Sequence, residues 1–264
     1  MISCFDFQKI EKPTVADAPK IAAPKVVAPK TSLPVKQVKA SSLTEEEVLY
    51  KQLKDYVDSK TISSKEALHT KKLASKKIPK GKKLTLKGKV IVVDPGHGGD
   101  DPGAMGPAGI WEKELNLKIA FMLADYLEEK GAKVYMTRKT DTRNSLKQIV
   151  SFANGLNADA YVAVHLNSID NSKISGTETY YYKYKDKKLA NIMHQEITKG
   201  LQLKNNGLKK ARLYVLRHSN MPTVLVEPAY VSNPQEAKLL ARPETRQQIA
   251  DALYRGLIRY LQSK

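Results

Sequence analysis

The sequence predicts an α/β fold, namely a three-layer αβα sandwich with a mostly parallel central sheet, preceded by an extended basic N-terminal arm. From residue 89 onwards, short apolar runs alternate with amphipathic segments of helical period. Buried strands that alternate with helices are typical of a parallel sheet covered on both faces. Before residue 89 the composition changes, since residues 11–40 repeat Ala-Pro-Lys, a lysine-rich linker leads up to residue 87, and no long apolar run occurs.

The strands of this fold are predicted from short apolar or alternating runs. In order along the chain they are VIVV at 90–93, KVYMT at 133–137, ADAYVAV at 158–164, TETYYY at 177–182, RLYVL at 212–216 and TVLV at 223–226. The first, third and last are apolar almost throughout, which is typical of central strands of a parallel sheet.

The helices are predicted from apolar residues three or four positions apart. They are expected at 115–130, 146–156, 187–201 and 243–261. Gly131 ends the first of these helices.

The chain divides into three parts by composition. Residues 1–42 repeat Ala-Pro-Lys and are predicted to be a disordered spacer. Residues 43–86 combine a short helical segment with a lysine-rich linker, and residues 87–264 form the α/β domain. Residues 1–90 carry 20 Lys and Arg against 9 Asp and Glu. Such an arm attracts polyanions, which include nucleic acid, anionic lipid and acidic wall polymer.

Cysteine content and hydropathy exclude several classes of protein. Cys4 is the single cysteine, so there is no disulfide framework and no cysteine-based zinc site. No apolar stretch reaches the length of a transmembrane helix. The first ten residues, MISCFDFQKI, are too polar and too short for a complete signal peptide, so a leader is not evident.

The stretch VIVVDPGHGGDDPGAMG, residues 90–106, begins with a predicted buried strand and continues as a glycine-rich, acidic loop. A phosphate-binding loop is excluded, because no Lys-Ser/Thr pair follows the glycines and the aspartates would repel phosphate. A histidine between glycines, His97, is instead placed to approach a metal closely.

Ionisable residues follow three of the predicted strands. His97 follows the first, His165 comes directly after AYVAV, and Glu227 comes directly after TVLV. Ligands bind at the carboxyl edge of open α/β sheets, where these residues are expected to meet. Glu112 at the start of a helix adds a carboxylate, although Glu114 competes with it. Two imidazoles and one carboxylate are a known catalytic zinc set, which leaves the remaining glutamate free to act as a base.

The other histidines are weaker candidates. His69 in the lysine-rich arm and His194 on a helix flank are expected to be solvated. His218, in YVLRHSNMP, is a candidate for substrate binding through its loop.

Four motifs add a family resemblance. VVDPGHGGDDPGAMGPAGIWEKELNLKIA, VAVHLNS, GTETYYY and YVLRHSNMPTVLVEPAYVSNPQEAKLL together resemble the zinc-dependent N-acetylmuramoyl-L-alanine amidases that cut bacterial peptidoglycan. The resemblance runs from about residue 89 to the C-terminus and would make residues 87–264 a catalytic amidase domain. It implies one Zn²⁺ per chain held by His97, Glu112 and His165, with Glu227 as the catalytic glutamate.

The resemblance also implies a mechanism and a location. Zinc would activate a water, and Glu227 would carry its proton to the leaving amine, with Asn167 or Arg217 as a candidate oxyanion donor. Peptidoglycan is the implied partner, the periplasm or cell envelope the implied location, and a monomer without a specific nucleic-acid partner is expected. Ala229-Tyr230 stands where the family more often has Gly-Phe. Only one helix fits between TYYYK and YVLR, so an open site without an inhibitory helix is expected.

Two alternative functions remain at this level. A zinc peptidase or deacetylase would use the same residues on another cell-wall amide. A non-catalytic wall-binding protein would use the basic arm, but such a protein has no need of Glu227.

Overall fold

A six-stranded sheet forms the middle layer of the structure, a computed structural model that describes residues 85–107 and 109–263. In chain order the strands are β1 (Val90–Pro95), β2 (Lys133–Met136), β3 (Ala160–Val164), β4 (Thr177–Tyr181), β5 (Asn205–Lys210) and β6 (Thr223–Glu227). They lie in the order β2-β1-β3-β6-β4-β5, and only the β4–β6 pair is antiparallel. The predicted α/β fold with a mostly parallel sheet is therefore confirmed.

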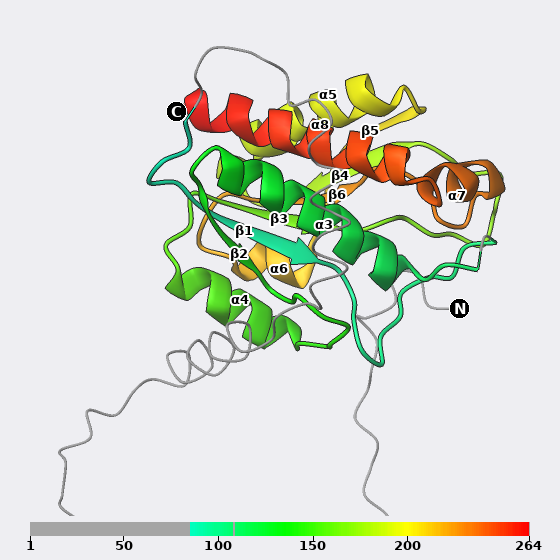
Figure 1. The fold of residues 1–264 in the computed structure, drawn as a ribbon, viewed down its shortest axis with the longest axis horizontal. Coiled ribbons are helices and arrows are strands. Elements are labelled where there is room, and N and C mark those ends of the chain that lie inside the picture. Colours follow the sequence, from blue (N-terminus) through cyan, green and yellow to red (C-terminus); the bar gives the residue numbers. More distant parts are fainter. Residues whose placement is uncertain (1–84, 108, 264) are drawn as a thin grey trace, which may run out of the picture.

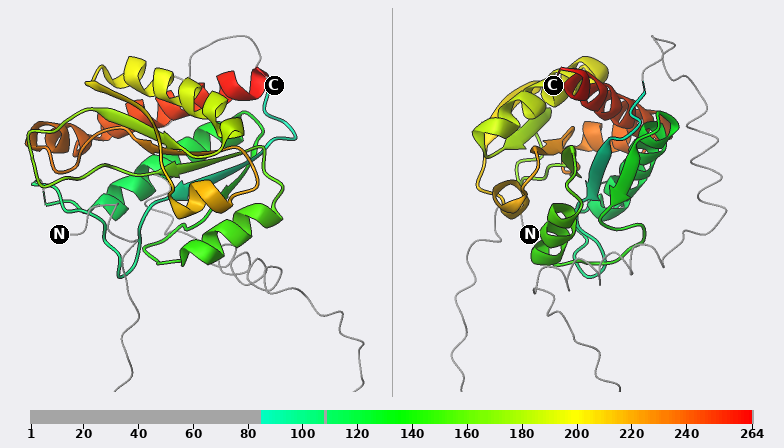
Figure 2. Two further views of the ribbon diagram at one scale, coloured as in Figure 1. Left: turned by 180° about the vertical axis from the view of Figure 1, so that it is seen from behind. Right: turned by 90° about the vertical axis from the view of Figure 1, so that its left-hand side faces the viewer.

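Helices cover both faces of this sheet (Figure 1). The helices on one face are α3 (Glu112–Glu129), α5 (Lys187–Leu201) and α8 (Pro243–Gln262). The shorter α4 (Leu146–Gly155) and α6 (Tyr214–His218) lie on the other face, and α7 (Pro234–Leu240) precedes α8. The two further views in Figure 2 show the same three layers from behind and from the side.

The two core clusters follow from the two faces of the central strands. All five residues of β3 are buried, and so are all five of β6. Because side chains alternate along a strand, Val162 and Val224 join the larger cluster under α3, α5 and α8, whereas Ala163 and Leu225 join the smaller cluster under α4 and α6. Both faces of the two central strands are therefore packed, as their continuous apolar sequences predict.

The prediction was wrong between residues 202 and 218. The strand expected at 212–216 is absent, and α6 begins at Tyr214 with Val215 and Leu216 buried. The strand of this region is β5, whose sequence NNGLKK is polar because β5 is an edge strand. Period-two hydrophobicity is lost in such a strand, and the two apolar residues that suggested a strand pack from a single helical turn instead.

The helix α7 was also missed. Its Asn233 side chain caps the helix by accepting hydrogen bonds from the backbone N–H groups of Gln235 and Glu236, and Pro234 occupies the first turn. Asn-Pro before an apolar-periodic segment is a helix start signal, so the sequence did contain the evidence.

The structure describes two residues before the predicted domain boundary at residue 87. Leu86 is a core residue and its N–H donates to the carbonyl of Lys130. The predicted spacer at 1–42 and most of the segment at 43–86, with His69, lie outside the described residues. Within residues 85–107 and 109–263, no helix combines the length and the apolar character needed to cross a membrane.

Candidate active site

Three parallel strands deliver the candidate site residues to one edge of the sheet. Val164 pairs with Pro95 on one side and with Val226 on the other. His165 and Glu227 are the next residues along β3 and β6, and the His165 N–H donates to the carbonyl of Val226 at 3.1 Å. The parallel register therefore brings these two residues side by side at the carboxyl edge, where ligands bind in open α/β sheets.

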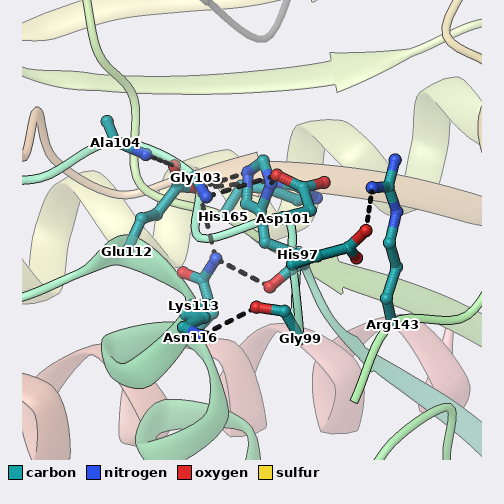
Figure 3. A network of polar contacts seen from close by, with 12 residues as sticks. His97, Gly99, Asp101, Gly103, Ala104, Glu112, Lys113, Asn116, Arg143 and His165 are labelled. Carbon is teal, nitrogen blue, oxygen red and sulfur yellow. Dashed lines mark hydrogen bonds and ion pairs between the residues drawn. The ribbon is translucent and has the colours of Figure 1, made fainter. Parts of the chain in front are cut away.

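The structure brings His97, Glu112 and His165 together into one cluster (Figure 3). One ligand atom from each residue lies within 4.8 Å of the other two. Glu112 Oε1 is 3.2 Å from His97 Nε2 and 3.3 Å from His165 Nδ1. The two imidazole rings meet edge to face with centroids 5.0 Å apart. Two imidazole nitrogens and a carboxylate oxygen at this separation can hold a metal ion.

The orientation of His97 is fixed by a neighbouring carboxylate that the sequence analysis missed. His97 Nδ1 lies 2.9 Å from Asp101 Oδ1, which leaves Nε2 facing Glu112. The hydrogen bond to His97 lowers the pKa of the Asp101 carboxyl, against the opposing effect of burial. A carboxylate behind a metal-facing histidine selects the ring tautomer and orientation. An aspartate four residues after a histidine in the same loop was the available signal.

Glu112 is held by its own set of donors. It is the first residue of α3 and is buried, whereas Glu114 is exposed, so the structure distinguishes the two competing glutamates. Glu112 Oε1 accepts from the Leu166 N–H at 3.1 Å and from Asn116 Nδ2 at 3.2 Å, and Oε2 accepts from the Ala104 N–H at 3.2 Å. Burial by itself would raise the pKa of Glu112, but the facing histidines outweigh it and the pKa is lowered.

Two glycines explain why this loop is rich in glycine. A Cβ atom on Gly96 would lie 2.2 Å from the His165 ring. A Cβ atom on Gly103, whose φ is +66°, would lie 2.7 Å from a carboxylate oxygen of Glu112 and 2.8 Å from the His97 ring. His97 itself has a φ of 64°, a left-handed conformation that is costly for a residue with a side chain. The loop is thus shaped to bring the three polar side chains together.

A buried guanidinium ties the loop to the start of α3. Arg138 is 2% exposed, and its three nitrogens donate to backbone carbonyls at 2.8–3.2 Å. The acceptors are Pro95, Gly96, Lys113 and Thr140. Burial lowers the pKa of this guanidinium to about 10, which leaves it charged at neutral pH. One side chain therefore holds the backbone next to His97 and next to Glu112.

Glu227 lies beside this cluster without belonging to it. Among the described residues, the group that can hold a metal contains His97, Glu112 and His165 only. Glu227 is 3% exposed and follows four buried residues of β6. Its position next to His165 in the register leaves it available for a role other than metal binding.

The three residues predicted to assist the reaction or bind substrate are Asn167, Arg217 and His218, and they lie in two different parts of the structure. Asn167 is buried, and its amide nitrogen donates one hydrogen to Glu178 at 3.1 Å; its role as an oxyanion donor stays a prediction. Arg217 and His218 lie on α6, whose buried Val215 and Leu216 join the same cluster as Leu225 of β6, and the ring centroids of His218 and Tyr214 are 4.3 Å apart. Neither belongs to the metal-binding group.

The prediction of a solvated His194 was wrong. Its ring is buried between α5 and the sheet, with Nδ1 3.0 Å from Thr179 Oγ1 and Nε2 2.8 Å from Asn205 Oδ1. Both partners are polar residues of strands, which the periodicity of α5 does not reveal. His194 therefore has a structural role on the face opposite to Glu227.

Comparisons with known proteins agree with this geometry. The chain matches the N-acetylmuramoyl-L-alanine amidase family over residues 91–259. It is 37% identical over 201 residues to the germination-specific N-acetylmuramoyl-L-alanine amidase of Bacillus subtilis (strain 168), a match that covers 69% of this chain and 83% of that protein. It is 33% identical over 233 residues to the amidase LytC of the same organism, where it covers 87% of this chain and 47% of that protein.

Solved amidase structures share the fold. The catalytic domain of CwlV, from Bacillus (Paenibacillus) polymyxa var. colistinus, superposes with a TM-score of 0.65 at 36% identity, covering 67% of this chain and 99% of that chain. The amidase AmiC2 of Nostoc punctiforme gives a TM-score of 0.64 at 40% identity, with coverage of 66% and 97%. The fold, the cluster at its carboxyl edge and these similarities lead to one conclusion: the chain belongs to the N-acetylmuramoyl-L-alanine amidase family.

Proposed function

We propose that this protein is a zinc-dependent amidase that hydrolyses the bond between N-acetylmuramic acid and L-alanine in bacterial peptidoglycan. The observation that carries the proposal is the cluster of His97, Glu112 and His165 next to Glu227. Membership of the amidase family supports peptidoglycan amide hydrolysis as the reaction. The donor set fits zinc, because two imidazoles and one carboxylate leave a fourth position for water.

In this mechanism, His97, Glu112 and His165 would hold the metal, and Asp101 would keep the His97 ring in the required tautomer. When bound, zinc supplies a water of lowered pKa and polarises the amide carbonyl. Glu227 accepts a proton from the water as its oxygen bonds to the carbonyl carbon. Glu227 then returns the proton to the alanine nitrogen as the carbon–nitrogen bond breaks, the two-way use of one acid/base group.

The direct test is digestion of purified peptidoglycan with and without a chelator, followed by mass spectrometry of the released ends. We expect new amino-terminal alanine and intact muramic acid, and we expect both to disappear with the chelator and return with added zinc. Cleavage within the stem peptide would favour a peptidase, and released acetate would favour a deacetylase. Binding without any new ends would favour the non-catalytic wall-binding protein.

The cell envelope is the proposed place of action, because the similar proteins act on or are named for cell-wall material.

The basic N-terminal arm is proposed to hold the enzyme near anionic wall polymer or a membrane surface. A chain that starts at residue 85 should cleave soluble muropeptides as the full chain does but bind sacculi less tightly. Raised salt should shrink this difference, since exposed charges are screened beyond about 8 Å at physiological ionic strength. Equal binding of the full and the shortened chain to sacculi at low salt would contradict this role of the arm.

A further inference from the structure

A second buried carboxylate lies opposite Glu227, and the proposed mechanism does not use it. Glu178 of β4 is 3% exposed and is the direct partner of Glu227 in the antiparallel β4–β6 ladder. Opposite residues in such a ladder have Cβ atoms about 4.5–5.5 Å apart, and like charges there are destabilising. Burying a second negative charge beside the first is costly, so this arrangement needs a physical explanation.

Four donors converge on the Glu178 carboxylate. Oε1 accepts from Lys209 Nζ at 2.5 Å and from the Tyr230 hydroxyl at 2.7 Å. Oε2 accepts from Asn167 Nδ2 at 3.1 Å and from the Tyr180 hydroxyl. Burial by itself would raise the pKa of Glu178, but these donors outweigh it and the pKa is lowered. Glu178 is therefore charged at neutral pH. We call its carboxylate and the four donors together the Glu178 hub.

Two of the four donors come from the loops that carry the proposed site residues, whereas Tyr180 and Lys209 lie on β4 and β5. Asn167 lies two residues after His165, and Tyr230 lies three residues after Glu227. The two loops also pair with each other, since Asn167 makes backbone hydrogen bonds of 2.9 and 2.8 Å to the Glu227 loop. Glu178 is thus bonded to both loops at once, while a strand of the sheet fixes its own backbone.

We propose that Glu178 is a positioning residue that sets the loop of Glu227 against the loop of His165. The inference rests on the proposed function, in which Glu227 is the base and His165 holds the metal. Its physical basis is that a misplacement of about 1 Å in an active site can cost about 100-fold in rate. His97 and Glu112 have separate supports in Asp101 and Asn116. The backbone of His165 is held apart from the hub by its own hydrogen bond to the Val226 carbonyl at 3.1 Å, so we expect the metal ligands to stay in place when the hub is lost.

The test is Glu178→Gln in the full chain, measured on a soluble muropeptide. We expect kcat to fall by about 10- to 100-fold with KM and zinc content unchanged, because the base is displaced while the metal ligands stay. The matched control is Asp186→Asn, which removes another buried carboxylate at the far end of β6, where it accepts from the Thr223 N–H at 3.2 Å. The control should lower the melting temperature without lowering kcat.

A second variant keeps the test decisive if Glu178→Gln does not fold. Tyr230→Phe removes one hydroxyl from the hub and leaves the carboxylate and the other three donors. It should lower kcat by a smaller factor at unchanged KM and zinc content. The inference is overturned if Glu178→Gln loses its zinc, or if both it and Tyr230→Phe have the kcat of the control. A wild-type enzyme that leaves the muropeptide uncut would instead overturn the proposed function.

Discussion

The two faces of the sheet are built from different kinds of residue. Under α3, α5 and α8 lies a large apolar cluster that includes Leu123, Ile249 and Leu253, each fully buried. Under α4 and α6 the cluster is smaller, and charged residues lie on the same side of the sheet. Buried apolar area is the main favourable term in folding. The face of α3, α5 and α8 therefore supplies most of the stability.

The charged residues of the other face follow from strand alternation. Asp94, Glu178 and Glu227 are each two positions from a residue of the smaller cluster, so they point to the same side of the sheet. Asp94 accepts from the Tyr161 hydroxyl at 2.5 Å and from the Thr137 hydroxyl, and Glu178 has four donors. Burial of carboxylates costs stability, and active sites are where such groups gather. Most of the apolar packing thus lies on one face and Glu227 points to the other, while Glu112 reaches the site from the first residue of α3.

His165→Ala should have the largest effect on activity. Removal of one of three proposed ligands should release the metal and abolish turnover, because the remaining two cannot form a catalytic zinc site. Elemental analysis of the purified variant, read beside its turnover, checks this. The control is His194→Ala on the opposite face, which should lose stability but keep zinc and kcat. Full zinc occupancy in His165→Ala would overturn the assignment of this ligand.

Arg138→Lys should have an intermediate effect. Lysine keeps the charge but loses the planar fork that bonds the carbonyls beside His97 and Glu112. We expect zinc affinity to fall by about 10- to 100-fold, the usual effect of changing residues that hold metal ligands in place. Competition with a chelator of known affinity measures the change. An unchanged zinc affinity with a lower melting temperature would mean that Arg138 supports the fold alone.

Leu253→Ala should have the smallest effect on activity. It opens a cavity in the larger cluster and should lower the free energy of unfolding by about 2–5 kcal/mol. The folded fraction should keep its zinc and its kcat, because Leu253 is on the face away from Glu227. Denaturant unfolding and turnover at low temperature measure the two quantities. A fall in kcat in the fully folded variant would contradict the separation between the faces.

The features that depend on neighbouring residues in the chain could be predicted from the sequence. The apolar runs before His165 and Glu227 predicted both the central strands and the edge at which these residues meet. The glycines around His97 predicted a close approach of side chains, which the contacts of Gly96 and Gly103 now explain.

What the sequence did not reveal depends on partners far apart in the chain. Arg138 binds carbonyls more than 40 residues away, and Glu178 is bonded to Tyr230 52 residues away. Periodicity assigns such residues only to a strand or a loop. The buried ring of His194 was missed for the same reason, because its partners Thr179 and Asn205 lie on two different strands.

The central claim is that Glu112 binds the metal and Glu227 carries the proton. It is tested most directly by the zinc content and turnover of Glu227→Gln beside those of Glu112→Gln. Glutamine keeps the size of the side chain, so Glu227→Gln should retain one zinc while turnover falls by about 10²- to 10⁴-fold. Glu112→Gln should lose zinc affinity, and excess zinc should partly restore its rate. Loss of zinc from Glu227→Gln with full zinc in Glu112→Gln would contradict the account and reverse the two roles.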